Sequence, residues 1–367
     1  MFPLSAQDLE TYARQVILED IGPEGQTKLR SSKVCLVGLG GLGTPTALQL
    51  TAMGVGRLRI IDRDIISRTD LHRQFLYDVS SIGYPKVEVG SKKLSQLNPD
   101  VKVEPIPNSL TAYNAEELLG DSDILVDGLD NAAGRYIINR TAQKLKIPYV
   151  YGAAIESYGS AMTIIPGQTP CMACVFPNLS DENLPKCAVV GVLPPILSMV
   201  SSIMVSEVVR VLTGKEPILS GKMLYADLRH LTFDTVELNK NENCLVCGQV
   251  DSPIIEQDKP EGIEYSCGRD GKGVLVITPL RSLDLDLAAL RNAIESAGLR
   301  VKRETDFSTA FEVDEKITIN VLRSGNAIAE VKPPVPKGDV KKIIMSKFKQ
   351  IVEDGLKLKQ GYYFHPV

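Results

Sequence analysis

Three glycines near the start of the chain are spaced in a way that suits a phosphate-binding turn. Gly38, Gly40 and Gly43 fit the pattern G-x-G-x-x-G, and Asp62 follows at about 20 residues' distance. Small residues let the backbone approach phosphate closely, and the acid can bind ribose hydroxyls. A purely structural glycine turn is the alternative, but the added Asp62 favours a nucleotide site, which could hold either NAD or ATP.

The charged residues that follow this turn favour phosphoryl chemistry. Arg73 and Lys86 could neutralise charge on a triphosphate, and Asp130 could hold a Mg²⁺ ion that bridges phosphate oxygens. Each residue alone would more often be a solvated surface charge, so the prediction depends on the whole set. The motifs concerned are Asp62-Arg-Asp64, Leu71-His-Arg-Gln74, Gly83-Tyr-Pro-Lys86 and Asp127-Gly-Leu-Asp-Asn131.

Four of the seven cysteines form two Cys-x-x-Cys pairs, which are Cys171 with Cys174 and Cys244 with Cys247. Four thiolates make a closed tetrahedral Zn²⁺ site, whereas a redox pair would need only two. The N-terminus shows no secretory pattern, which favours metal or thiols over disulfides. We therefore expect a structural zinc ion that ties two distant parts of the chain together.

Cys187 is the candidate nucleophile. It lies in the polar stretch Leu184-Pro-Lys-Cys-Ala188, where the adjacent Lys186 favours a thiolate. A free cysteine is more often a small buried apolar side chain, and Cys35 and Cys267 are interpreted in that way. Cys187 lies outside the neighbouring apolar run and outside the zinc set, so we predict a functional thiol.

Alternating strands and helices must position these residues. Short apolar runs predict strands at 33–37, 57–61 and 123–127, and a helix at 44–53 follows the glycine turn. Residues 5–8 form a capping box, which predicts a first helix that ends near Gly22-Pro23. This pattern indicates an α/β, Rossmann-like domain with a mainly parallel sheet flanked by helices.

The composition is that of a globular protein with a sizeable core. The 367 residues are 44% hydrophobic and 23% charged, and a net charge of −4 provides no basic field for nucleic acid. The uncharged segment 188–206 contains Pro194-Pro195 and is followed by Glu207 and Arg210, so it predicts a buried helix and no membrane span. We expect a cytoplasmic protein without a nucleic-acid or membrane partner.

The length exceeds the roughly 250–300 residues at which single cores stop growing, so we expect two domains. Residues 1–249 would form the nucleotide-binding domain and 250–262 a polar, proline-bearing linker. Residues 263–367 would form a small α+β domain that could dock a partner. This segment contains no rhodanese-like cysteine loop. Its predicted elements are a strand at 274–278, a helix at 283–297, a hairpin at 317–332 turning at 324–326, and a helix at 339–353.

The ordered set of motifs resembles the ubiquitin-activating-enzyme-like family, which includes the adenylyltransferases of the molybdopterin-synthase and thiamine sulfur carriers. The resemblance covers about residues 5–249. It rests on the nucleotide motifs and paired cysteines given above, together with Tyr12-Ala-Arg-Gln15, Gly38-Leu-Gly-Gly-Leu-Gly43 and Gly152-Ala-Ala154.

The resemblance implies that ATP is used to adenylate the C-terminal carboxylate of a small ubiquitin-like or sulfur-carrier protein of β-grasp fold ending in Gly-Gly. Cys187 matches the position where such enzymes carry a cysteine that forms a thioester or persulfide. In a homodimer, Arg14 would reach the site of the other subunit. The implied nucleotide and metal contacts come from Gly38, Gly40, Gly41, Leu42, Gly43, Asp62, Asp64, Arg73, Gln74, Lys86 and Asp130.

Asp70 departs from this family, which usually has asparagine at that position. A further carboxylate near phosphate is unfavourable unless it is protonated or paired with a cation, so Asp70 could also turn away from the site. Whether the adenylate proceeds to a thioester for conjugation or to sulfur transfer stays open. The α+β domain could dock a conjugating enzyme in the first case.

Two other classes of function remain as alternatives. An NAD-dependent oxidoreductase would share the glycine turn and Asp62, but the three histidines of the chain stand in no evident acid/base motif. A non-catalytic binding subunit would share the fold. The presence of Arg14, Arg73, Lys86 and Asp130 in one chain favours an active homodimer instead.

Overall fold

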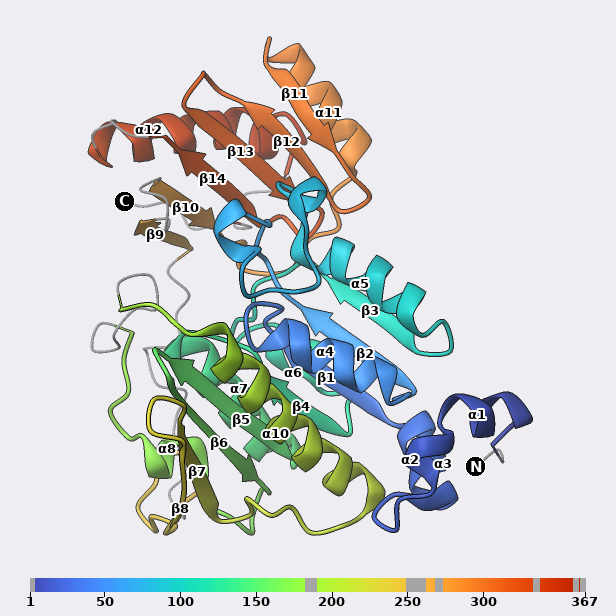
Figure 1. Cartoon of the computed structure of the whole chain (residues 1–367). Helices are drawn as coiled ribbons and strands as arrows, with labels where there is room; N and C mark the ends of the chain where they lie inside the picture. The colour runs from blue at the N-terminus through green and yellow to red at the C-terminus, as the bar shows by residue number, and fades with distance from the viewer. Residues whose placement is uncertain are drawn as a thin grey trace.

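Two sheets organise the chain, one in each predicted domain (Figure 1). The computed structural model describes residues 4–181, 190–248, 262–267, 273–332, 337–358 and 363. Within these residues, the first sheet has eight strands in the order β3-β2-β1-β4-β5-β6-β7-β8. The second has six strands in the order β11-β12-β13-β14-β10-β9.

The first half of the eight-stranded sheet is parallel. β1 (Lys33–Val37) pairs with β2 (Arg57–Ile61) on one side and with β4 (Ile124–Asp127) on the other. β3 (Lys102–Ile106) and β5 (Tyr149–Ile155) continue the sheet in parallel at its two sides. The strand order reverses between β1 and β4, and in doubly wound sheets ligands bind outside the carboxyl ends of strands at such a point.

The second half of this sheet is antiparallel and was not identified from the sequence. β6 (Tyr158–Ile164), β7 (Lys222–Asp227) and β8 (Thr232–Glu237) follow β5 in order. The predicted fold class, an α/β sheet that is mainly parallel, is confirmed with this antiparallel extension.

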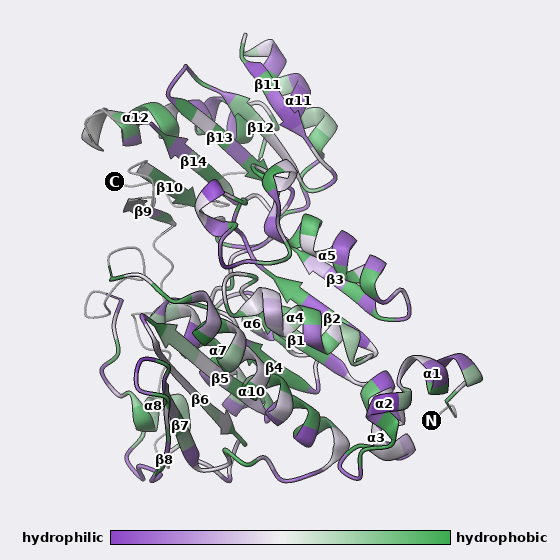
Figure 2. Ribbon diagram, viewed as in Figure 1, coloured by the Kyte–Doolittle hydropathy of each residue, from purple (hydrophilic) through white to green (hydrophobic). Residues whose placement is uncertain are grey.

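Helices cover both faces of the sheet. In β1, Val34 and Leu36 pack into one hydrophobic core and Cys35 and Val37 into another, because successive strand residues point to opposite faces. Figure 2 shows how the hydrophobic residues gather along the central strands. The first core contains α3 (Gly22–Ser31), α4 (Gly43–Ala52), α5 (Lys86–Leu97) and α10 (Pro194–Thr213), and the second α6 (Ala115–Leu119), α7 (Ala132–Leu145) and α8 (Met172–Val175).

α10 is the long apolar helix expected from the sequence. By length and composition it could cross a membrane, but 56% of its apolar window is buried inside the protein. It packs on α4, β5 and β6, and its buried Glu207 accepts hydrogen bonds from Thr163 Oγ1 at 2.7 Å and from Leu219 N at 2.9 Å. These contacts make it a core helix of the first domain.

The predicted first helix is wrong in its extent. The capping box is confirmed, since Ser5 N donates to Asp8 Oδ2 at 2.7 Å. However, α1 (Ala6–Thr11) ends at Thr11, and the next helix, α2 (Ala13–Val16), is short. Gly22-Pro23 begins α3 instead of ending a helix. Proline is tolerated in a first helical turn because its missing N–H has no intrahelical partner there.

The second sheet is antiparallel throughout, and helices cover one of its faces (Figure 1). Three of its strands, β9, β11 and β12, were not identified from the sequence, and residues 250–261 of the predicted linker lie outside the described residues. The predicted hairpin is confirmed, with Gly325 in the left-handed region at φ 88°. The elements are β9 (Ile263–Cys267), β10 (Gly273–Ile277), α11 (Leu287–Ser296), β11 (Arg300–Glu304), β12 (Ser308–Glu312), β13 (Ile317–Leu322), β14 (Ala327–Val331), α12 (Lys337–Phe348) and a π-helical stretch (Lys349–Asp354).

Candidate functional site

The glycine turn lies between β1 and α4, as the sequence predicts. Gly38 has φ 89°, and a Cβ atom placed on it would lie 2.6 Å from the carbonyl oxygen of Gly128. A Cβ atom on Gly43 would lie 2.0 Å from the carbonyl oxygen of Gly38. Only glycines permit this approach of the β1 and β4 ends. At the start of α4, Thr44 N donates to the carbonyl oxygen of Gly40 at 2.9 Å and Thr46 N to that of Leu42 at 3.3 Å, and Pro45 has no N–H, so an anion would be held by the amides of the turn itself.

Asp62 is tied to this turn. Its Oδ2 atom accepts a hydrogen bond from Leu39 N at 2.7 Å, and its Oδ1 atom accepts one from Asp64 N at 2.7 Å. Burial raises the pKa of Asp62 to about 6, and the positive charge of Lys86 opposes that rise. The carboxyl group is therefore fixed beside the turn where a ribose would lie in a doubly wound nucleotide site.

Lys86 is the first residue of α5, and its side chain is buried close to the carboxyl group of Asp62. Its Nζ atom donates to Asp64 Oδ2 at 2.7 Å. Burial alone would lower the pKa of Lys86, but the carboxylates of Asp64, Asp62 and Asp70 outweigh burial and raise it. Lys86 is accordingly a cation at neutral pH that is held in place by acids.

Asp70 does not turn away from the site. Its Oδ1 atom accepts hydrogen bonds from Arg73 Nη2 at 3.0 Å and from Gln74 Nε2 at 2.9 Å, and its Oδ2 atom accepts one from Ser67 N at 2.9 Å. Asp70, Arg73 and Gln74 are all buried. Of the two alternatives that the sequence left open, pairing with a cation is the correct one.

Gln74 and Tyr77 connect this segment to the glycine turn. A Cβ atom on Gly40 would lie 3.9 Å from Gln74 Nε2, and Tyr77 Oη donates to the carbonyl oxygen of Leu39 at 2.9 Å. Tyr77 is buried and was not identified from the sequence, because nothing in its local motif separates it from an ordinary core tyrosine. The predicted glycines, acids and bases thus meet at one edge of the sheet.

A buried ion pair fixes the loop that carries Asp130. Asp127 lies 3.2 Å from Arg135 Nε, and it accepts hydrogen bonds from Tyr149 Oη and Leu129 N, both at 2.8 Å. Arg135 was also missed, although its position on α7 shortly after the Asp127–Asn131 motif was a usable signal. Asp130 itself is exposed, one residue beyond Leu129, whose nitrogen faces Gly38.

One predicted catalytic residue, Arg14, is not brought to this edge. Arg14 is exposed on α2, and its neighbour Gln15 donates to the carbonyl oxygen of Met53 at 3.1 Å, beyond the end of α4 that is remote from the turn. Arg14 therefore lies far from the site of its own chain. Cys187 lies outside the described residues.

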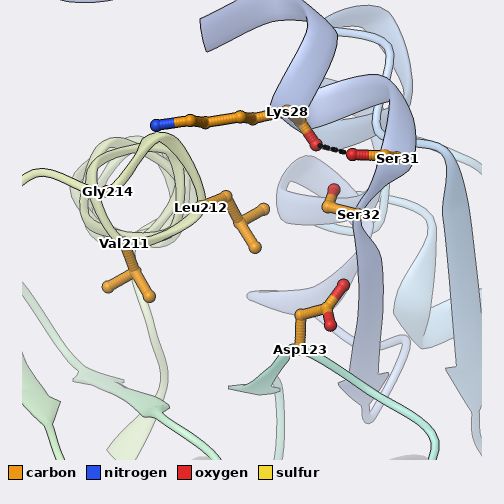
Figure 3. Close-up of a pocket in the computed structure, with 7 residues that line it drawn as sticks. All are labelled: Lys28, Ser31, Ser32, Asp123, Val211, Leu212 and Gly214. Atoms are coloured by element: carbon orange, nitrogen blue, oxygen red, sulfur yellow. Dashed lines mark hydrogen bonds between the residues drawn. The ribbon is translucent and has the colours of Figure 1, made fainter. Parts of the chain in front are cut away.

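A hollow of about 480 Å³ lies at the opposite edge of the sheet (Figure 3). Ser32 and Asp123 precede β1 and β4 there, and Lys28 Nζ donates to the carbonyl oxygen of Thr213 at 2.7 Å. None of the predicted nucleotide residues lines it. The polar edge at the carboxyl strand ends, and not this hollow, is the candidate site. The lining residues are Lys28, Ser31, Ser32, Asp123, Val211, Leu212 and Gly214.

The four paired cysteines form one cluster. The sulfur atoms of Cys171 and Cys244 are 3.7 Å apart, and those of Cys174 and Cys247 are 3.3 Å apart, with all four within 4.8 Å of one another. Four thiolates at about 2.3 Å from a tetrahedral Zn²⁺ ion would be separated by about 3.8 Å. The cluster fits a structural zinc ion that joins α8 to the chain beyond β8.

Comparisons with known proteins agree with this geometry. The family model described as the ThiF family matches residues 12–246. The "SAMP-activating enzyme E1" of Haloferax volcanii is 38% identical over 247 residues, which make up 67% of this chain and 91% of that protein. The "Sulfur carrier protein ThiS adenylyltransferase" of Bacillus subtilis is 33% identical over 321 residues, or 86% of this chain and 93% of that protein.

A solved structure supports the fold. The crystal structure of E. coli MccB superposes with a TM-score of 0.60 at 22% identity and covers 67% of this chain and 74% of that one.

We expect the purified protein to contain one zinc ion per chain, measurable by elemental analysis. Cys174→Ser should lose the metal and lower the melting temperature, because three thiolates cannot close the tetrahedral site. Cys35→Ala, in the core strand β1, should keep it. Full zinc occupancy in Cys174→Ser would contradict the assignment.

The affinity for ATP should fall as the pH drops through about 6, because a protonated Asp62 no longer accepts both ribose hydrogen bonds and its pKa is raised to about 6. Calorimetric titration between pH 5 and pH 8 measures this. ATP phosphates titrate in the same range, so Asp62→Asn provides the baseline. Equal pH dependence in both proteins would reject the ribose contact.

Asp70→Asn should bind ATP about 3- to 10-fold more tightly, since it removes a negative charge that faces the cations of the site. The variant should also melt at a lower temperature, because an amide nitrogen cannot accept the hydrogen bond from Ser67 N. Asp121→Asn, at the opposite edge of the sheet, is the control. Weaker ATP binding would instead mean that the charge of Asp70 is needed to hold Arg73.

Proposed function

We propose a function that proceeds from one fact: this chain belongs to the ThiF family. The enzyme uses ATP to adenylate the C-terminal carboxylate of a small ubiquitin-like or sulfur-carrier protein of β-grasp fold that ends in Gly-Gly. The proposal rests on one observation: the glycine turn is surrounded by acidic and basic side chains that a dinucleotide-binding site does not require. Lys86 and Arg73 are buried there, each paired with a carboxylate.

In this proposal the amides of the glycine turn hold the phosphates, and Asp62 binds the ribose. Arg73 and Lys86, with Gln74 and Asp64 beside them, neutralise the charge that develops on the phosphates. Asp130, exposed beside the turn, would hold Mg²⁺, which would supply charge neutralisation on the phosphate oxygens when bound.

The reaction is an in-line displacement. A carboxylate oxygen of the partner forms a bond to the α-phosphorus, while the bond from that phosphorus to the bridging β oxygen breaks and pyrophosphate leaves with the electron pair. The chain contributes mainly positioning and charge neutralisation, because no proton needs to move at the attacking carboxylate. In a second step, the Cys187 thiolate attacks the acyl carbon and AMP leaves.

The names of two relatives are consistent with two different fates of the acyl-adenylate. One relative is named a SAMP-activating enzyme E1, and another a sulfur carrier protein adenylyltransferase. We favour thioester formation on Cys187, with sulfur transfer as the second candidate. A homodimer would complete the site, because Arg14 lies far from the turn of its own chain. Membership of this family argues against an NAD-dependent oxidoreductase.

ATP–pyrophosphate exchange with small proteins ending in Gly-Gly tests the first step. Wild-type enzyme should catalyse exchange that depends on the partner, and Asp130→Ala should lower it by about 100-fold or more, because transition-state charge is then less well neutralised. Asp100→Ala, an exposed acid beyond α5, should behave as wild type. Full exchange in Asp130→Ala would remove Asp130 from the site.

A gel without reductant tests the second step. Incubation with ATP and the partner should give an adduct that thiol reductants release, and Cys187→Ala should lose the adduct while keeping ATP–pyrophosphate exchange. Cys267→Ser serves as the matched cysteine control. An adduct that persists in Cys187→Ala would assign the thioester to another residue.

A further inference from the structure

The six-stranded sheet lies over the carboxyl ends of the parallel strands (Figure 1). Its contacts with the first domain include Arg63, the neighbours Gly83 and Tyr84, and residues 107–109, besides an exposed ion pair at Lys92. Asp62 and Asp64 flank Arg63, Lys86 follows Tyr84 by two residues, and residues 107–109 follow β3, the strand beside β2. The predicted docking domain therefore lies against the candidate nucleotide site itself.

Arg63 makes the most direct connection. Its Nη1 and Nη2 atoms donate to Glu264 Oε1 at 2.8 Å and to Glu264 Oε2 at 2.6 Å, a two-pronged ion pair between the β2 end and β9. Arg63 Nη1 also lies 3.3 Å from Ser109 Oγ, which it reaches as a donor. Asp62 and Asp64, on either side of Arg63, contact Leu39 and Lys86 instead, so the ion pair holds the backbone between two site residues.

The segment after β3 is fixed by a buried polar network. Ser109 Oγ donates to Asn326 Oδ1 at 2.6 Å, and Asn326 Nδ2 donates to Asn108 Oδ1 at 2.7 Å. Ser324 Oγ donates to the carbonyl oxygen of Pro107 at 2.5 Å. Asn326 is fully buried in the β13–β14 turn. Buried amides and hydroxyls with satisfied partners fix one relative position of two elements, since each unpaired group would be costly.

The segment before Lys86 makes a third contact. The guanidinium carbon of Arg303 lies 4.6 Å from the ring centre of Tyr84, and Asn320 Nδ2 lies 3.5 Å from the carbonyl oxygen of Gly83. Between β2 and α5 the described chain forms short 3₁₀ turns and an isolated bridge between Ile65 and Pro85, with Ile66 N donating to Tyr84 O at 2.9 Å and Gly83 N to Ile66 O at 2.8 Å. The contacts of Gly83 and Tyr84 with the second sheet therefore also reach the segment that follows Asp62.

We propose that the six-stranded sheet is a structural part of the nucleotide site, and that Glu264, acting through Arg63, positions Asp62 for the ribose of ATP. Glu264 is a positioning residue and touches no reacting atom. The inference rests on the proposed function for the identity of the nucleotide. It assigns the C-terminal domain a role in ATP binding that is separate from partner docking.

The reason is entropic. Fixing a residue's backbone costs conformational entropy, and a site that is already ordered does not meet this cost when the ligand binds. Loss of the ion pair would therefore weaken ATP binding while leaving the chemical step unchanged once ATP is bound. Carrier-protein binding would also remain unchanged.

The test compares Glu264→Gln with Asp306→Asn in the full chain. Asp306 also joins the two domains, through Lys92 at 3.5 Å, but both of those side chains are exposed and remote from the strand ends. Glu264→Gln should raise the Kd for a non-hydrolysable ATP analogue and the KM for ATP by about 3- to 10-fold, with kcat and the KM for the carrier protein unchanged. Asp306→Asn should match wild type in all four values.

Arg63→Gln and the double variant complete the test. If the residues act as a pair, the double variant binds the analogue no more weakly than either single variant. In the absence of nucleotide, hydrogen exchange at the amides of residues 62–66 should be faster in Glu264→Gln. Because this change is local, it can be measured even if the variant has a lower melting temperature. Unchanged ATP binding in a folded Glu264→Gln protein, or unchanged exchange at 62–66, would overturn the inference.

The outcomes separate the two proposals. If wild-type protein binds no ATP analogue, both the proposed function and this inference fail. If it binds the analogue and activates a carrier protein, but Glu264→Gln equals wild type, only the inference fails. Because binding of the analogue needs no carrier protein, a failure to find the partner does not affect the measurement.

Discussion

The approach of two backbones at Gly38 and Gly128 is the constraint on which the site depends. It brings the end of β4 against the turn after β1, and no side chain fits between them. As a result, Gly128, which begins the loop that carries Asp130, lies against Gly38 and Gly43 at the two ends of the turn. The pair Asp127 and Arg135 then holds the loop in that position from within the core.

The charges around the turn are balanced before any nucleotide binds. Lys86 is paired with Asp64, and Arg73 with Asp70, so each buried cation has an acid within hydrogen-bond distance. Buried charges without such partners would be strongly unfavourable. The same pairing fixes the cations where phosphate charge would develop, and fixed dipoles and charges need no rearrangement during reaction. The additional carboxylate of Asp70 reduces the net positive charge available to the triphosphate.

The two ends of the first sheet have different tasks. The parallel half ends in the glycine turn and the acids, whereas the antiparallel half is held by α10 and by the cysteine cluster beyond β8. A zinc ion there would join α8, next to β6, to the chain that follows β8, and would order the part of the domain that has the weaker helical cover. The cysteine cluster would thus serve stability, and the candidate nucleotide site would serve the chemistry.

The sequence by itself determined the nucleotide motifs, the strand, turn and helix around Gly38, the zinc cysteines and the family, because each depends on residues close together or on a fixed spacing. The buried helix α10 and the β13–β14 hairpin were also readable from local patterns. The antiparallel strands β6 to β8 were missed: β6 pairs with β5 and β8 with β7 through short local turns, and only the pairing of β6 with β7 joins distant segments. Prediction also failed at Gly22-Pro23, where the same two residues can end one helix or begin another.

Only the tertiary structure decided what Asp70 contacts, because Arg73 and Gln74 reach it through a turn whose geometry the sequence does not specify. The same holds for the domain interface. Arg63 and Glu264 are 201 residues apart in the chain, and no local pattern relates them. Their contact exists because the second sheet is placed over the ends of β2 and β3. The sequence thus identified which residues could bind a nucleotide, and the packing of one domain on the other decided what holds them in position.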